Sequence, residues 1–208
     1  MEHYEMPIPE PAEKYYLQTA LDRAIDNFGK KHNSDQLRYQ LAEEAYIGVI
    51  ASIQAGLEKY RQAAAKMGSK DIRGEEHNSK RLGEHLRATG KAKPDDRCDA
   101  HAIVSGAHKY AALGRAMLAR HKIRIDDPDN GCWLPRRSKD TPHWAFPKAI
   151  PHSRIHRFNY YFHVWNVIRN TKNEPTLRFA LQRIGARLQD GTLPKNVMLP
   201  KGQGLDEL

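Results

Sequence analysis

The chain has 208 residues, of which 39% are hydrophobic and 28% are charged, so it can form one packed domain with an additional segment. It has no run of about 18 apolar residues and no signal-peptide pattern at its first residues, which excludes a membrane-spanning helix and predicts no secretory signal peptide. Residues 1–97 hold 16 basic and 16 acidic side chains, whereas residues 98–208 hold 18 and 9, which favours a polyanionic partner for the second half.

The first half of the chain has the pattern of a helical hairpin. Apolar residues recur with a period of about 3.6 over residues 12–28 and again over residues 37–66. We therefore expect a helical module over residues 1–66 that lies outside any catalytic core. Residues 67–96 contain few apolar residues and are expected as a linker or charged arm, with a short helix at 79–88 as an option.

The second half combines strand and helix patterns. The predicted elements are strands at residues 98–105 and 131–136 and helices at residues 109–121, 152–170 and 174–189. The Asn130-Gly131 pair before the second strand is typical of a hairpin turn with positive φ. We expect a mostly helical α+β protein, with residues 97–190 as its second domain and residues 191–208 as a C-terminal tail.

Three histidines fall where a metal site can form. His101 lies on the first predicted strand, and His152 and His156 are four residues apart at the start of a predicted helix. Residues i and i+4 share one helix face, and neutral imidazole is the most common nitrogen ligand of transition metals. In a ββα-metal nuclease the strand supplies a catalytic histidine, the second strand supplies an asparagine that braces the loop, here Asn130, and the helix supplies metal ligands. The order of these residues favours such a core with one divalent cation.

The same segments resemble the AHH family of nucleases in the HNH/endonuclease VII superfamily. The resemblance covers roughly residues 97–190 and rests on Ala100-His-Ala-Ile-Val104, the helix at 109–121, the segment Ile125–Pro135, His152-Ser-Arg-Ile-His156 and Tyr160-Tyr161. It implies a metal-dependent endonuclease that cleaves DNA without sequence specificity, with RNA as the alternative substrate. The implied cofactor is a divalent ion, namely Mg²⁺, Mn²⁺, Ni²⁺ or Zn²⁺.

Members of this family commonly serve as toxic tips of bacterial polymorphic toxins and as secretion-system effectors. The resemblance therefore implies a protein made in the bacterial cytoplasm, exported without a signal peptide and active in the cytoplasm of a target cell. It also implies an immunity protein that neutralises the toxin. Because the second half of the chain is basic, we expect this partner to be acidic.

The chain departs from the family motif at Ala102, where the motif has a second histidine. In the superfamily the first histidine binds the metal and the second is the general base, so His101, His152 and His156 would bind the metal and the base would be missing. Three imidazoles suit Zn²⁺ or Ni²⁺ better than Mg²⁺.

Two explanations of Ala102 stay open. In the first, a histidine at position 102 has been replaced by alanine, which would inactivate a toxic enzyme. Restoring that histidine would then raise the cleavage rate about 10²–10⁴-fold. Alternatively alanine is the natural residue and His101 is itself the base, with the metal bound by His152, His156 and either Asp99 or Asn130.

Five basic residues bracket the expected site and are candidates for contact with nucleic acid: Arg136, Arg137, Lys139, Arg154 and Arg157. Such contacts to phosphates do not depend on sequence and weaken with salt. A second interpretation of the whole chain is a catalytically dead nucleic-acid-binding protein on a nuclease scaffold. A third is a histidine-rich structural metal domain, which would fold only with metal. Restoring histidine at position 102 separates the first two, since only an inactivated enzyme would gain activity.

Overall fold

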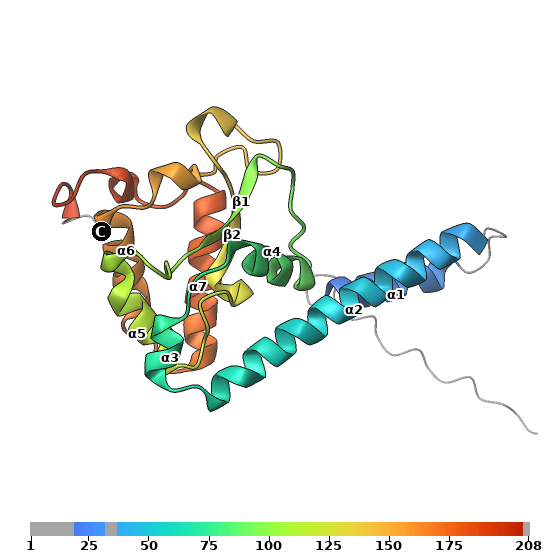
Figure 1. Cartoon of the computed structure of the whole chain (residues 1–208). Helices are drawn as coiled ribbons and strands as arrows, with labels where there is room; N and C mark the ends of the chain where they lie inside the picture. The colour runs from blue at the N-terminus through green and yellow to red at the C-terminus, as the bar shows by residue number, and fades with distance from the viewer. Residues whose placement is uncertain (1–18, 32–36, 206–208) are drawn as a thin grey trace, which may run out of the picture.

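The computed structural model describes residues 19–31 and 37–205 (Figure 1), so the helix predicted over residues 12–28 falls partly outside the described residues. The α-helices are α1 (Ala20–Lys31), α2 (Leu37–Lys66), α3 (Ser69–Gly74), α4 (Ser79–Ala88), α5 (Ala112–Arg120), α6 (Phe158–Ile168) and α7 (Glu174–Gln189). The strands are β1 (Cys98–Ala102) and β2 (Gly131–Pro135). Short 3₁₀ helices lie at Lys109–Ala111, Pro128–Asn130, Ser138–Asp140, His152–Arg154 and Lys195–Met198. The protein therefore has the mostly helical α+β architecture that the sequence predicts.

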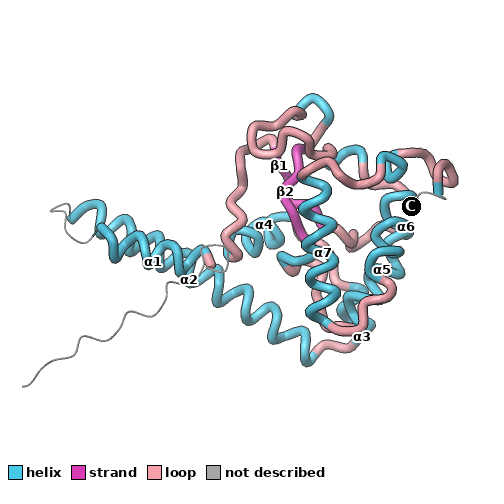
Figure 2. The backbone as a smooth tube through the Cα atoms, turned by 180° about the vertical axis from the view of Figure 1, so that it is seen from behind, coloured by secondary structure: helices cyan, strands magenta, loops and turns pink. Residues whose placement is uncertain are grey.

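α1 and α2 form a helical arm that projects from the body of the molecule (Figures 1 and 2). α1 packs along α2, and the C-terminal part of α2 reaches the body, where Leu57, Tyr60 and Ala64 are buried. Arg61 forms an ion pair of 2.9 Å with Asp127 in the loop before β2. The predicted pair of helices is present, and the end of its second helix is packed on the core. The division of the chain into separate modules stays a prediction.

Residues 67–96 contain α3, which the expected linker or arm did not include, and α4, which has the bounds of the optional helix at 79–88. Asn78 caps α4 with its side-chain oxygen, and the apolar residues Ile72, Leu82 and Leu86 are buried. Helices this short are not stable alone in water, and these two gain their stability by packing on α5 and β1. The low apolar content of the region is misleading, because Ile72, Leu82 and Leu86 are nevertheless all buried.

β1 and β2 pair antiparallel, with Ala102 opposite Gly131. Successive side chains of a strand point to opposite faces. Ala100 and Ala102 face α4, where they join a small apolar cluster that contains Cys98, Leu82, Leu86 and Trp133. His101 points to the other face, toward α6 and the main core. His101 and Ala102 are adjacent in the motif but therefore lie on opposite faces of the hairpin.

The predicted boundaries in the second half of the chain agree with the structure to different degrees. α7 has the predicted bounds, and both strands end slightly earlier than predicted. The helix predicted over residues 152–170 is wrong in its first part, because α6 begins only at Phe158. Among the described residues, no helix is both long enough and apolar enough to cross a membrane.

Candidate active site

His101 is fully buried beneath β1, between the sheet and α6. The hydroxyl of Tyr160 donates a hydrogen bond to the carbonyl of Ile103 (3.2 Å) and therefore accepts one from Nε2 of His101 (3.0 Å). This arrangement places the proton of the neutral imidazole on Nε2 and leaves a lone pair on Nδ1. Nδ1 is buried and has no hydrogen-bond partner among the described residues. An unpartnered buried nitrogen is unfavourable unless a ligand occupies its lone pair.

His152 and His156 lie on a turn and not, as predicted, on one regular helix. His152 begins a 3₁₀ helix after Pro151, and the chain becomes extended at Arg157, directly before α6. Ile155 lies between the two histidines and is fully buried, so it anchors the turn in the core. The prediction that the two imidazoles lie close together is nevertheless confirmed, because their Nε2 atoms are 2.7 Å apart.

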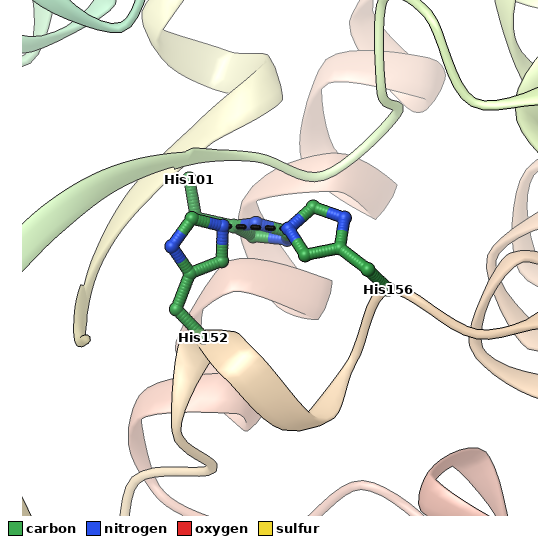
Figure 3. A group of neighbouring side chains, drawn as sticks. All are labelled: His101, His152 and His156. Atoms are coloured by element: carbon green, nitrogen blue, oxygen red, sulfur yellow. Dashed lines mark hydrogen bonds between the residues drawn. The ribbon is translucent and has the colours of Figure 1, made fainter. Parts of the chain in front are cut away.

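The three imidazoles converge on one point (Figure 3). The ring centroid of His101 is 4.9 Å from that of His152 and 5.6 Å from that of His156. One nitrogen of each ring lies within 4.8 Å of the corresponding nitrogens of the other two. Three nitrogen donors in this arrangement fit a zinc-like cation that keeps open positions for water or substrate.

Electrostatics keep these imidazoles neutral, as metal ligands must be. Burial lowers the pKa of His101 well below its usual value, and a positive charge on His152 or His156 would lower it further. Burial also lowers the pKa of His152, although the carboxylate of Asp99 opposes this shift. The pKa of His156 falls to about 4, mainly through burial and then through His152, with smaller contributions from His108 and His77.

The second nitrogen of each imidazole faces an oxygen. Nδ1 of His156 lies 2.9 Å from the hydroxyl of Tyr161, and Nε2 of His101 binds Tyr160 as described. Nδ1 of His152 lies 3.7 Å from the carboxylate of Asp99, which Arg136 holds by hydrogen bonds of 2.9 and 3.0 Å. Partners of this kind orient metal-binding histidines and set their tautomers. The chemistry of the donors and of their surroundings therefore fits a divalent cation.

Asn130 braces the loop that follows β1. Its side-chain oxygen accepts a hydrogen bond from the amide of Val104 (2.9 Å), and its side-chain nitrogen donates to the carbonyls of Val104 (3.1 Å) and Ile125 (2.8 Å). The expected positive-φ turn at Asn130-Gly131 is wrong, because Gly131 has a φ of −138°. Glycine is needed there for another reason, since a Cβ would lie 2.6 Å from Cδ1 of Leu82.

A pocket of about 620 Å³ opens beside the three imidazoles, and His152 and His156 form part of its wall. Ala102 lies in this wall with Lys80, Arg87 and Lys93. The predicted contact residues Arg136, Arg137, Lys139, Arg154 and Arg157 are not in its lining, at least as far as the chain is described. Sequence reasoning missed the basic residues that do line the pocket because they come from the region expected as a linker. The signal that could have revealed them is the Asn78-Ser79 cap before two leucines four residues apart.

Cys98 and Cys132 are buried free thiols. Burial raises the pKa of Cys98 to about 11 and that of Cys132 to about 12, so neither is a reactive thiolate at neutral pH. Cys98 lies 3.6 Å from His143, whose Nε2 is hydrogen-bonded to Asp95. Asp95 also accepts hydrogen bonds from Arg97 and Trp144, so this group is satisfied without a metal.

Comparison with known proteins identifies the family of the chain. A family model described as a nuclease family of the HNH/ENDO VII superfamily with conserved AHH matches residues 82–189. No curated protein matches the chain, and no solved structure does. The matched segment is more than half of the chain and contains His101, Asn130, His152 and His156. It begins within α4, which agrees with the packing of that helix on β1. The chain therefore belongs to the AHH family of nucleases in the HNH/ENDO VII superfamily.

Proposed function

We propose that this nuclease is a metal-dependent endonuclease that cleaves DNA without sequence specificity and holds its divalent cation with His101, His152 and His156. The observation that carries the proposal is the convergence of these imidazoles around a buried, unpartnered Nδ1 of His101. When bound, a divalent cation polarises the scissile phosphate and neutralises the leaving 3′ oxygen. Full burial of His101 supports its assignment as a ligand, because a general base must reach the attacking water.

Charge supports a nucleic acid backbone as the substrate. Lys80, Arg87 and Lys93 line the pocket, and Arg137, Lys139 and Arg154 are exposed on nearby segments. Arg136 is paired with Asp99, so it is better suited to orient His152 than to bind a phosphate. Cationic side chains without a defined base-reading element favour contact with phosphates, which does not depend on sequence.

The further biological proposal is an antibacterial toxin or effector, neutralised by an acidic immunity protein. It rests on the family resemblance and on the net charge of +9. Charge complementarity would make association fast and salt-sensitive. We expect an affinity pull-down from the producing bacterium to yield an acidic partner that inhibits cleavage. Recovery of only a neutral or basic inhibitor would contradict this part of the proposal.

A catalytically inactive nucleic-acid-binding protein is the second candidate function. The observation that favours it is Ala102, whose methyl group lines the pocket where the motif would place an imidazole. A methyl group cannot accept a proton from water. This candidate predicts that the chain binds metal and DNA but does not cleave DNA.

Cleavage after metal removal tests the proposal. The full chain is treated with a chelator, and Mg²⁺, Mn²⁺, Ni²⁺ or Zn²⁺ is returned separately in the presence of supercoiled plasmid or structured RNA. We expect nicking and linearisation of the plasmid with at least one cation and none in the chelator. His121→Gln is the matched control for cleavage, because His121 lies at the C-terminal end of α5 and does not line the pocket. Cleavage that persists in excess chelator would exclude metal dependence, and DNA binding without cleavage under all conditions would favour the second candidate.

A further inference from the structure

The structure places another histidine beside Ala102. His77 and Ala102 line the same pocket as His152 and His156. His77 lies in the segment between α3 and α4, before the residues that the family model matches. Strand alternation directs Ala102 toward α4, away from His101. An imidazole at position 102 and the imidazole of His77 would therefore line the same pocket.

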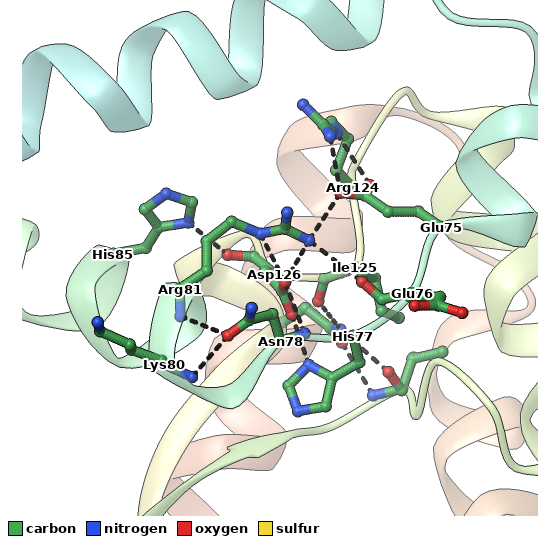
Figure 4. Close-up of polar contacts among 12 residues, drawn as sticks. Glu75, Glu76, His77, Asn78, Lys80, Arg81, His85, Arg124, Ile125 and Asp126 are labelled. Atoms are coloured by element: carbon green, nitrogen blue, oxygen red, sulfur yellow. Dashed lines mark hydrogen bonds and ion pairs between the residues drawn. The ribbon is translucent and has the colours of Figure 1, made fainter.

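Asp126 holds the His77 imidazole in one orientation (Figure 4). Nδ1 of His77 lies 2.5 Å from Oδ1 of Asp126, and the ring turns its other nitrogen away from this carboxylate. A carboxylate can only accept, so the neutral imidazole carries its proton on Nδ1 and a lone pair on Nε2. The side chain is 27% exposed, so water can reach the ring. A carboxylate behind an imidazole is the arrangement that orients a general base and stabilises its protonated form.

Asp126 is itself firmly anchored. Its carboxylate is fully buried and accepts hydrogen bonds from the amide of Asn78 (3.0 Å) and from Nε of Arg81 (2.8 Å). Burial alone would raise the pKa of Asp126, but the hydrogen bonds from His77 and Asn78 and the positive charge of Arg81 lower it. On the backbone, Asp126 donates its amide to Tyr60 (3.0 Å). Helices α2 and α4 thus fix the carboxylate that orients His77.

The loop after β1 also positions His77. A Cβ at Gly106 would lie 2.8 Å from Cβ of His77 and 3.1 Å from its backbone nitrogen. Glycine therefore allows the His77 segment to pack directly against this loop. Asn130 holds the same loop through its hydrogen bonds to Val104. The loop after β1 therefore contacts both Asn130, which braces the core, and the segment that carries His77.

We propose that His77 is the general base of this nuclease and takes the place of the imidazole that the motif carries at position 102. This inference rests on the proposed function. Nε2 of His77 accepts a proton from a water molecule while the oxygen of that water forms a bond to phosphorus. The bond between phosphorus and the 3′ oxygen breaks, and the 3′ oxygen takes a proton from solvent. The products are a 5′-phosphate and a 3′-hydroxyl, and His77 returns its proton to solvent.

This assignment differs from both explanations that the sequence leaves open. Neither a replaced histidine nor a basic role for His101 is required, because the base comes from a different segment. Lys80 lines the same pocket and follows His77 by three positions. Its ammonium group can hold a phosphate near Nε2 of His77. The inference and the missing-base explanation make opposite predictions for Ala102→His.

The test uses the full chain with His77→Ala, His77→Gln, Ala102→His and the double variant His77→Ala/Ala102→His. Single-turnover DNA cleavage is measured at saturating metal, with metal affinity by calorimetry and DNA affinity in chelator as independent readouts. Glutamine keeps a donor for Asp126 but cannot act as a base. His121→Ala is the matched control for loss of a histidine, because His121 does not line this pocket.

We expect both His77 variants to cleave about 10²–10⁴-fold more slowly, the usual effect of losing a general base. Their metal and DNA affinities should stay within about twofold of the unmodified chain, since His77 lies outside the three converging imidazoles. Ala102→His alone should not raise the rate, because His77 already supplies the base, and in the His77→Ala background it should restore most of the lost rate.

Two results would overturn the inference. One is near-normal cleavage by His77→Gln, and the other is a gain of about 10² or more from Ala102→His alone. Either result leaves the proposed function intact, because the chain still cleaves DNA. An unmodified chain that cleaves neither DNA nor RNA with any of the four metals contradicts the proposed function, and the inference falls with it.

Discussion

His156→Ala and His101→Ala are each expected to reduce metal affinity at least about 100-fold and to abolish detectable cleavage. Each variant removes one of the three nitrogens that converge on the site. Replacing only an outer partner of a ligand costs about 10–100-fold in affinity, and loss of the ligand itself costs more. Calorimetric titration of the chelator-treated chain with Zn²⁺ or Ni²⁺ measures the affinity, and plasmid cleavage measures activity.

Tyr161→Phe provides a graded comparison, because it removes the hydroxyl that faces Nδ1 of His156 but no ligand. Its metal affinity should fall between that of the unmodified chain and that of His156→Ala. His121→Ala should match the unmodified chain. If His101→Ala kept full metal affinity while His152→Ala and His156→Ala lost it, His101 would not be a ligand, and the alternative with Asp99 or Asn130 would gain support.

Asn130→Ala is expected to lower the free energy of unfolding by about 3 kcal/mol, because each of three hydrogen bonds contributes on the order of 1 kcal/mol. The side chain is fully buried, so water cannot replace these bonds. The variant leaves the amide and carbonyl of Val104 and the carbonyl of Ile125 without their partner. Urea denaturation of the metal-free chain measures the change.

Asn173→Ala serves as the control for Asn130→Ala. Asn173 caps α7 at an exposed position, and loss of such a cap costs about 1 kcal/mol. Asn130→Ala could instead leave the stability of the metal-free chain unchanged and greatly weaken metal binding. Asn130 would then be a metal ligand and not a brace of the loop. That result would contradict the hydrogen-bonding role described above.

Local patterns were sufficient for most elements of the nuclease core. α7 and the two strands follow from periodicity over a few residues, because such patterns reflect which face of an element is buried. His152 and His156 lie close together although the helix boundary was predicted wrongly. Residues four positions apart are close both in a helix and in a tight turn. The AHH family assignment likewise depends on short motifs in order, and the family match confirms it.

Contacts between distant segments decided the rest. His77 and Asp126 are 49 residues apart, and no local signal indicates that they meet. Region 67–96 resembles a linker because it has few apolar residues, yet Leu82 and Leu86 are fully buried against β1. The sequence by itself determined the family, the strand–helix order and the three converging histidines. Only the tertiary structure decided which side chains fill the pocket around Ala102, because that depends on packing between α4, β1 and the loop before β2.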